Sequence, residues 1–414
     1  MKLLTVVRRV LLAVLGVQLA VAAGLTLVDS YRRRGKKPKP FPTRPPMETE
    51  VGSGTVTTYT FGSDLYADML TAIAGARKQV LLESYIWKGD EVGEQFKRAV
   101  CDAADRGVDV HVIHDAFANL VVSPRFKRFP RNVKVLAYPV YTAGWRFLDL
   151  RRYGRDHRKI LVVDDEVAFV GGYNIGTPYA TEWRDTHCRI TGPAVFDLKR
   201  AFADFWNLNR TKRFQMPRHR VQPLLTGTAP TWEPRIRIQR NVPRLWMFPI
   251  RAMYIEAINK AERNVWLTHA YFIPDENFVQ TLTDAAERGV DVRLLLPAKS
   301  NHIVVDWISR GYFSVMLDAG IRIYRFNDAM VHAKTATVDG SWSTIGTANV
   351  DRLSMTGNYE INVEIIDANL AAEMERIFIT DLSSCHELGI AEWRSRDIYR
   401  RFTETFLSPL RHLL

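Results

Sequence analysis

One pattern of spaced residues occurs twice in this chain. In each copy a histidine is followed by lysine at +2, aspartate at +7, glycine at +14, asparagine at +17 and an acidic residue at +28. The first copy consists of His157, Lys159, Asp164, Gly171, Asn174 and Asp185. The second consists of His332, Lys334, Asp339, Gly346, Asn349 and Glu360. Two sets with equal spacing do not arise by chance at ordinary residue frequencies, so the sequence predicts one structural unit built twice.

A second repeat lies upstream of each copy. Residues 103–110 read AADRGVDV and residues 285–292 read AAERGVDV. In both, a helical pattern ends at a glycine suited to the left-handed position after a helix, and a buried strand follows. Apolar runs at 80–87 and 265–273 predict another core strand before each helix. Alternating strands and helices favour two α/β sandwich domains.

The length of 414 residues suits two such domains and an N-terminal appendage. The expected division is an anchor and basic, proline-rich linker at 1–46, a first domain at 47–215 and a second at 216–414. Residues 207–240 are polar and rich in arginine, and we expect them to connect the two domains. Their basic side chains are either solvated or in contact with anionic lipid head groups.

The appendage has the composition of a membrane anchor. Residues 10–28 carry no charge and are just long enough to cross a bilayer as a helix. A cleaved signal peptide is the alternative, since 20–22 read Ala-Val-Ala. Six basic residues within 32–39 resist translocation. We therefore expect a single-pass protein of the cell membrane with its catalytic body on the cytoplasmic side.

Charge and cysteine content exclude several classes of protein. Most of the formal charge of +12 belongs to residues 1–46, so the body is nearly neutral and lacks the dense positive surface of a nucleic-acid-binding protein. The cysteines Cys101, Cys188 and Cys385 are far apart and odd in number, which indicates reduced thiols. Neither a disulfide framework nor a metal site is expected.

The repeated residues suit a chemical role. Side chains two apart on a strand share a face, so each histidine and its lysine can point at one place. The motif aspartates Asp164 and Asp339 fall at predicted hairpin bends, where they brace the fold more than they act in catalysis. Asp185 and Glu360 can hold the imidazoles in the required tautomer, so each unit carries an orienting carboxylate.

These residue types fit phosphoryl transfer without a metal or other cofactor. An imidazole is a nucleophile near neutral pH and, in a second copy, a general acid and base. Lysines stabilise the negative charge that grows on phosphate oxygens in the transition state. Asn174 and Asn349 can donate hydrogen bonds to those oxygens. The two units are expected to meet in one site.

At this point the chain resembles the phospholipase D superfamily, most of all bacterial cardiolipin synthases. The resemblance rests on 157–164 and 332–339. Further matching segments are 171–175, 183–187, 270–275, 346–351 and 358–360. It implies two α/β domains related by a pseudo-two-fold axis, with both motifs in one cleft, and a ping-pong route through a phosphohistidine.

The resemblance also implies roles for individual residues. His157 would be the nucleophile and His332 the acid and then the base, although the sequence leaves the reverse open. The expected catalytic set is His157, Lys159, Asp164, His332, Lys334 and Asp339. The expected supporting and phosphate-binding residues are Asn174, Asp185, Asn349, Glu360, Gly171, Gly172 and Gly346. Phosphatidylglycerol or another anionic phospholipid would be the substrate, at a membrane, with no obligate protein partner.

Four rival functions share this pattern or part of it. Hydrolytic phospholipase D would use water as acceptor, and a phosphatidylserine synthase would use another alcohol and a nucleotide-linked donor. A nuclease of the superfamily is disfavoured by the nearly neutral body, and an inactive scaffold by two intact motifs. Thr347 in place of the usual serine, and the order Arg352-Leu353-Ser354, depart from the family pattern and weaken the choice of acceptor.

The remaining histidines carry no repeated pattern. His111, His114, His219, His386 and His412 are expected to be structural or exposed. His187, His269 and His302 lie beside motif segments and are expected near the pocket without a catalytic role.

Overall fold

The computed structural model describes residues 39–141, 153–210, 223–229 and 231–397, together with residues 24, 403 and 406. The predicted span at 10–28 lies outside the described residues except for Gly24, and so do the basic cluster as far as residue 38, the predicted boundary at 215–216, His219 and His412. None of the helices within the described ranges has the length and apolar character that a membrane crossing requires.

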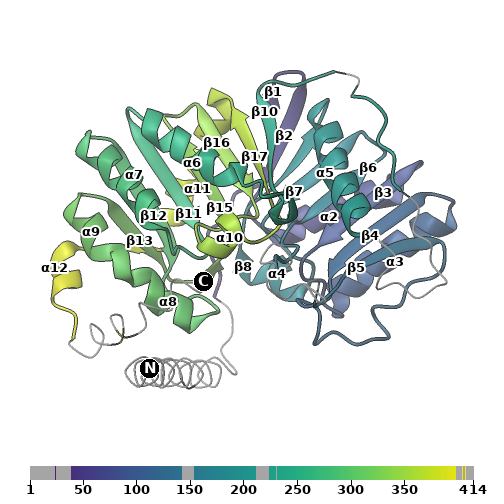
Figure 1. Cartoon of the computed structure of the whole chain (residues 1–414), viewed down its shortest axis with the longest axis horizontal. Helices are drawn as coiled ribbons and strands as arrows, with labels where there is room; N and C mark the ends of the chain where they lie inside the picture. The colour runs from purple at the N-terminus through teal and green to yellow at the C-terminus, as the bar shows by residue number, and fades with distance from the viewer. Residues whose placement is uncertain are drawn as a thin grey trace, which may run out of the picture.

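Two eight-stranded sheets form the body (Figure 1). In order across the first sheet the strands are β1 (Met47–Val51), β2 (Gly54–Tyr59), β9 (His187–Thr191), β7 (Val167–Gly171), β6 (Ile160–Val163), β3 (Gln79–Ser84), β4 (Asp109–Asp115) and β5 (Val133–Tyr138). Across the second they are β10 (Ile236–Asn241), β17 (Glu360–Ile366), β16 (Trp342–Gly346), β15 (Lys334–Val338), β11 (Asn264–His269), β12 (Asp291–Pro297), β13 (Arg322–Phe326) and β18 (Cys385–Glu387).

The centres of the two sheets have the same topology. In the first, the antiparallel hairpin β6–β7 adjoins the parallel strands β3, β4 and β5. In the second, the hairpin β15–β16 adjoins the parallel strands β11, β12 and β13 in the same way. Each hairpin carries one copy of the repeated pattern, so the predicted duplication of an α/β unit is confirmed.

The helices pack against the sheets (Figure 1). The first half contains α2 (Gly62–Gly75), α3 (Glu91–Asp105), α4 (Thr177–Thr181) and α5 (Ala194–Asn209). The second contains η2 (Pro243–Leu245), α6 (Pro249–Lys260), α7 (Glu276–Glu287), α8 (Ile303–Ser309), η3 (Arg310–Tyr312), α9 (Phe313–Asp318), α10 (Arg352–Thr356), α11 (Ala368–Leu382) and α12 (Ile390–Arg394).

The helices α3 and α7 show how the second repeat folds. Asp90 and Asp275 are their N-caps and accept from the backbone N–H of Gly93 and Phe278 at 3.1 and 2.8 Å. An N-cap carboxylate satisfies an N–H group that has no partner inside the helix. Beyond each helix a glycine, Gly107 or Gly289, adopts a φ of +91°. The left-handed glycine predicted from the sequence is therefore present in both repeats.

The two halves share a hydrophobic core and a small sheet. One core cluster combines Trp206 and Phe202 of α5 with Ile361 and Val363 of β17. The strands β8 (Trp183–Arg184) and β14 (Met330–Val331) pair in parallel across the halves. The buried guanidinium of Arg184 also binds the carboxylate of Asp381 in α11 through two hydrogen bonds of 2.8 Å. These contacts fix the position of one motif relative to the other.

Candidate active site

The two motif histidines enter their strands next to the opposite half. The backbone N–H of His157 donates to the carbonyl of Tyr359 at 3.0 Å, and that of His332 donates to the carbonyl of Arg184 at 2.6 Å. Tyr359 and Arg184 occupy equivalent positions, each just before the acidic residue at +28. Corresponding residues thus contact each other reciprocally, as across a two-fold interface. The regular strands begin only at Ile160 and Lys334, so the predicted placement of the histidines within the strands was wrong.

The orienting carboxylates are exchanged between the halves. The Nδ1 atom of His157 lies 3.0 Å from both carboxylate oxygens of Glu360, and the Nδ1 atom of His332 lies 2.6 Å from Oδ2 of Asp185. Our expectation that each unit carries its own orienting carboxylate was therefore wrong. The acid of one half binds the histidine of the other half for a local reason. Each acid directly follows the residue, Tyr359 or Arg184, whose carbonyl accepts from the backbone N–H of the opposite histidine.

The two lysines bring positive charge to one shared site. Both side chains are buried, and Nζ of Lys334 lies 2.9 Å from Nδ1 of His332. Burial lowers the pKa of Lys159 to about 8 and that of Lys334 to about 7, and the charge of Lys159 adds to the second shift. The contacts of His157 with Glu360 and of His332 with Asp185 join the two motifs in one site, as the sequence predicted.

The two orienting carboxylates differ in charge. Burial raises the pKa of Glu360 to about 8, although Lys159 and a hydrogen bond from Thr347 act in the other direction. Burial also opposes ionisation of Asp185, but Lys334 and His332 outweigh it and lower the pKa of this carboxyl. Near neutral pH Asp185 is therefore an anion and Glu360 is mainly protonated.

Both imidazoles are neutral in the unliganded site. Burial, followed by the charge of Lys334, lowers the pKa of His332 to about 3. Burial and then Lys159 and Lys334 hold the pKa of His157 well below its usual value. A neutral ring that donates from Nδ1 to a carboxylate keeps a lone pair on Nε2 for nucleophilic or base chemistry.

Aromatic rings surround these imidazoles. The ring centroid of Tyr85 lies 4.7 Å from that of His157. Trp183 and Tyr271 lie 5.1 and 6.3 Å from the ring of His332. Sequence reasoning did not assign these walls, although Trp183 and Tyr271 fall in the segments 183–187 and 270–275 that match the family pattern.

The motif aspartates lie at the far ends of the hairpin strands. Asp164, at φ +54°, accepts from the backbone N–H groups of Arg77, Lys78 and Gln79 at 2.7, 2.7 and 2.8 Å. Asp339, also at φ +54°, accepts from the equivalent backbone groups of residues 262–264. Seven residues of extended chain from the histidine correspond to about 20 Å. These hydrogen bonds support the predicted role of both aspartates as braces of the fold.

The remaining predicted residues are buried near the site but do not all suit phosphate binding. The side-chain oxygen of Asn174 accepts from the N–H of Ile86 at 3.1 Å, whereas Oδ1 of Asn349 has no hydrogen-bond partner among the described residues. At Gly172 a Cβ atom would lie 2.0 Å from the Asp185 carboxylate. The glycines Gly171, Gly172 and Gly346 therefore permit close backbone packing, and their expected role as phosphate ligands lacks support.

Five other histidines within the described residues lie where the sequence analysis expected them. His111 contacts Asp109 at 3.1 Å, and His386 contacts Glu392 at 2.7 Å at an exposed position. Burial lowers the pKa of His114 to about 4. His187 and His269 are buried next to the motif strands, and neither ring has a hydrogen-bond partner among the described residues. Within those residues no three His, Cys, Asp or Glu side chains gather as a metal site.

Two α/β units that place paired histidine and lysine side chains in one site define a protein of the phospholipase D class. The family described as cardiolipin synthase, PLD-like domain, matches at 69–206 and 254–382, and the chain belongs to that family. A cardiolipin synthase of Clostridium perfringens is 32% identical over 366 residues, which cover 85% of this chain and 76% of the relative. One of Staphylococcus aureus is 30% identical over 361 residues, which cover 85% and 72%.

Among solved structures, the phosphatidylserine synthase of Haemophilus influenzae has the same fold. The TM-score is 0.65 at 14% identity, with 86% of this chain and 93% of that chain covered. The predicted fold of two phospholipase D-like domains is thereby confirmed.

Proposed function

We propose that this chain is a phosphatidyltransferase that forms cardiolipin from two phosphatidylglycerol molecules and releases glycerol. The observation that carries the proposal is a single site with two neutral imidazoles, each bound at Nδ1 by the acidic side chain of the other half, and with two buried lysines. Membership of the cardiolipin synthase family gives the substrate class.

In the first step Nε2 of His157 attacks the phosphorus of the donor lipid. A nitrogen–phosphorus bond forms, the bond from phosphorus to the glycerol oxygen breaks, and a proton from Nε2 of His332 passes to that oxygen. The product is a phosphatidylated His157 and free glycerol. Lys159 and Lys334 stabilise the negative charge on the phosphoryl oxygens.

In the second step a hydroxyl of another phosphatidylglycerol attacks the same phosphorus. Nε2 of His332 accepts the hydroxyl proton, the bond to His157 breaks, and cardiolipin leaves with both imidazoles restored. The alternate use of one group as acid and base is what ping-pong transfer requires.

The charges of the carboxylates support this division of roles. An acid must carry an extra proton before it can give one away, and an ionised partner stabilises the resulting imidazolium. Asp185 is ionised and binds His332, whereas Glu360 is mainly protonated and binds His157. In the complex the bound phosphodiester anion adds a negative charge that opposes the lowered pKa of His332 and favours the protonated acid.

Exposed apolar side chains next to the site support a lipid substrate. Leu120 and Val121 are 59% and 96% exposed, and Phe117 in the same loop is 49% exposed. The loop is tied to the site because Asn119 donates to the carbonyl of Tyr85 at 2.8 Å, and the Tyr85 ring packs on His157. Apolar side chains at such a rim can enter a bilayer surface. With the predicted anchor, they support a single-pass protein whose body works at the cytoplasmic face.

The test uses purified full-length protein and phosphatidylglycerol vesicles without added metal. We expect equal amounts of cardiolipin and glycerol. His157→Gln and His332→Gln should each abolish product, while His386→Gln, at an exposed histidine, should match the wild type. Substantial turnover by either site variant, or activity on DNA alone, would contradict the proposal.

A further inference from the structure

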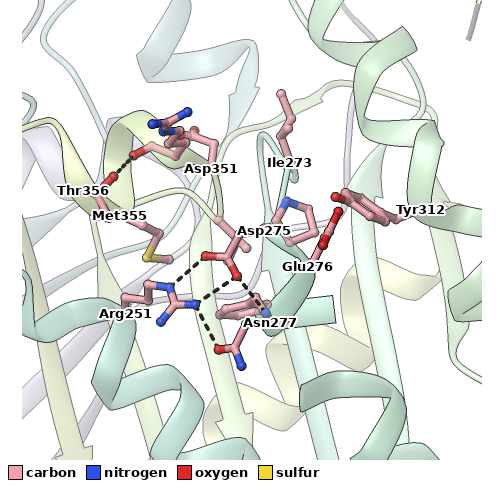
Figure 2. Close-up of a pocket in the computed structure, with 13 residues that line it drawn as sticks. Arg251, Ile273, Asp275, Glu276, Asn277, Tyr312, Asp351, Met355 and Thr356 are labelled. Carbon is pink, nitrogen blue, oxygen red and sulfur yellow. Dashed lines mark hydrogen bonds and ion pairs between the residues drawn. The ribbon is translucent and has the colours of Figure 1, made fainter. Parts of the chain in front are cut away.

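A cavity of about 620 Å³ lies in the second half of the molecule (Figure 2). Its walls come from α6, the beginning of α7, η3 and α10. The residues that line it are Arg251, Ile273, Pro274, Asp275, Glu276, Asn277, Phe278, Tyr312, Val350, Asp351, Arg352, Met355 and Thr356. The volume falls within the range of sites for small organic ligands.

The cavity shares two wall segments with the active site, both on the side of His332. One segment carries Tyr271, whose ring contacts His332, and continues two residues later to Ile273 in the cavity wall. The other runs from Asn349 to Asp351. The two segments are joined by a hydrogen bond of 2.7 Å from the N–H of Ile273 to the carbonyl of Val350. The cavity therefore adjoins His332, which in the proposed function accepts the proton of the acceptor hydroxyl.

The polar lining favours hydroxyl groups over phosphate. The guanidinium of Arg251 is engaged by Asp275 at 2.8 and 2.9 Å and by Asn277 at 3.0 Å, as Figure 2 shows. Glu276 adds an exposed carboxylate. Asp351 adds a second acceptor: its side chain caps α10 by accepting from the N–H of Ser354 at 2.7 Å, and burial raises the pKa of this carboxyl to about 7.

The apolar part of the lining is provided by Ile273, Phe278 and Met355, which are buried. Apolar walls with a few hydrogen-bond acceptors suit a small polyol. Its carbon chain can pack against the apolar side chains, and its hydroxyls can donate hydrogen bonds to the acceptors.

We propose that this cavity binds the polyol head group of the acceptor lipid and so selects it over water. The inference rests on the proposed function, and it assigns the acceptor to the side of His332. The head group would occupy the cavity while one hydroxyl reaches Nε2 of His332. The phosphate of the donor would stay with the lysines at the shared site.

The test fills the cavity mouth at exposed positions. Asn277→Trp and Thr356→Trp place an indole in the opening from α7 and α10. Gln280→Trp is the matched control, because it is exposed on the same helix as Asn277 but does not line the cavity. Phosphatidylglycerol vesicles are the donor, and cardiolipin and phosphatidic acid, the product of transfer to water, are measured together.

We expect the ratio of cardiolipin to phosphatidic acid to fall about tenfold or more in both cavity variants, with donor consumption retained and the control unchanged. Added methanol, which is too small to need the cavity, should be used as acceptor as well as by the wild type. An unchanged product ratio, equal losses of transfer to phosphatidylglycerol and to methanol, or loss of all products from folded variants would overturn the inference. A wild type that forms neither product would instead refute the proposed function.

Discussion

Replacing each orienting carboxylate by its amide tests the crossed site most directly. Asp185→Asn removes a buried negative charge 2.6 Å from Nδ1 of His332. Hydrogen bonds to charged groups contribute about 1.5–3 kcal/mol, which corresponds to a rate loss of about 10-fold to 150-fold. The amide can also donate to Nδ1 and so favour the wrong tautomer, as in a catalytic triad. We expect a loss at the upper end of this range or beyond.

Glu360→Gln should behave differently at neutral pH. The pKa of Glu360 is raised to about 8, so the carboxyl is mainly protonated at pH 7 and glutamine closely replaces it. The substitution then alters only hydrogen bonds between neutral groups, which contribute about 0.5–1.5 kcal/mol. We therefore expect the rate to fall by no more than about tenfold. Above pH 8 the wild-type carboxyl ionises, and the disadvantage of the variant should grow.

The assay is cardiolipin formation from phosphatidylglycerol vesicles between pH 6 and about 9.5, expressed as the ratio of wild-type to variant rate at each pH. Taking ratios removes the pH dependence that the enzymes share. We expect a large ratio for Asp185→Asn at pH 7 and a small ratio for Glu360→Gln that increases above pH 8. A ratio for Glu360→Gln at pH 7 that equals or exceeds the one for Asp185→Asn would refute the charge assignment.

Two further predictions concern the motif aspartates and the lysines. Asp164→Ala removes an acceptor of three backbone hydrogen bonds at a left-handed position and should lower the free energy of unfolding by about 2–4 kcal/mol. The folded fraction of this variant should retain the wild-type kcat. Denaturant titration measures the loss of stability, and active-site titration measures the fraction of active enzyme. A loss of kcat with unchanged stability would contradict the bracing role. The kcat/KM for phosphatidylglycerol should fall as pH rises through about 7 to 8, because Lys334 and then Lys159 lose their protons. A pH–rate profile that stays flat to pH 10 would contradict this.

The fold and the members of the site were largely predictable because they depend on local spacing. The repeat AADRGVDV/AAERGVDV fixed a helix, a left-handed glycine and a strand in both halves, and each was found. The motif positions also predicted hairpins with an aspartate at each bend. Equal spacing identified the acids at +28, although it gave no information on the histidine that each would contact.

The partner of each acid depends on contacts between residues far apart in the chain. His157 and Glu360 are separated by 203 positions, and His332 and Asp185 by 147. The pairing of β8 with β14 and the bonds between Arg184 and Asp381 bring these segments together. The aromatic residues Tyr85 and Tyr271 follow other strands of the two sheets. Tyr271 falls in the matching segment 270–275, but the spacing of the motifs did not show that either ring contacts an imidazole, so these contacts also required the structure.

The crossed carboxylates have a consequence for the two halves. A half on its own would contain a histidine without its carboxylate and an acid without its histidine, so neither half holds a complete imidazole–carboxylate pair. The same exchange allows the halves to differ in function. The pKa of Asp185 is lowered by Lys334 and His332 of the second half. Burial raises the pKa of Glu360 to about 8, although Lys159 of the first half and Thr347 of the second half act in the other direction. The one difference of acid type, within an otherwise equal spacing, thus accompanies the division that we propose between a nucleophile half and an acid–base half.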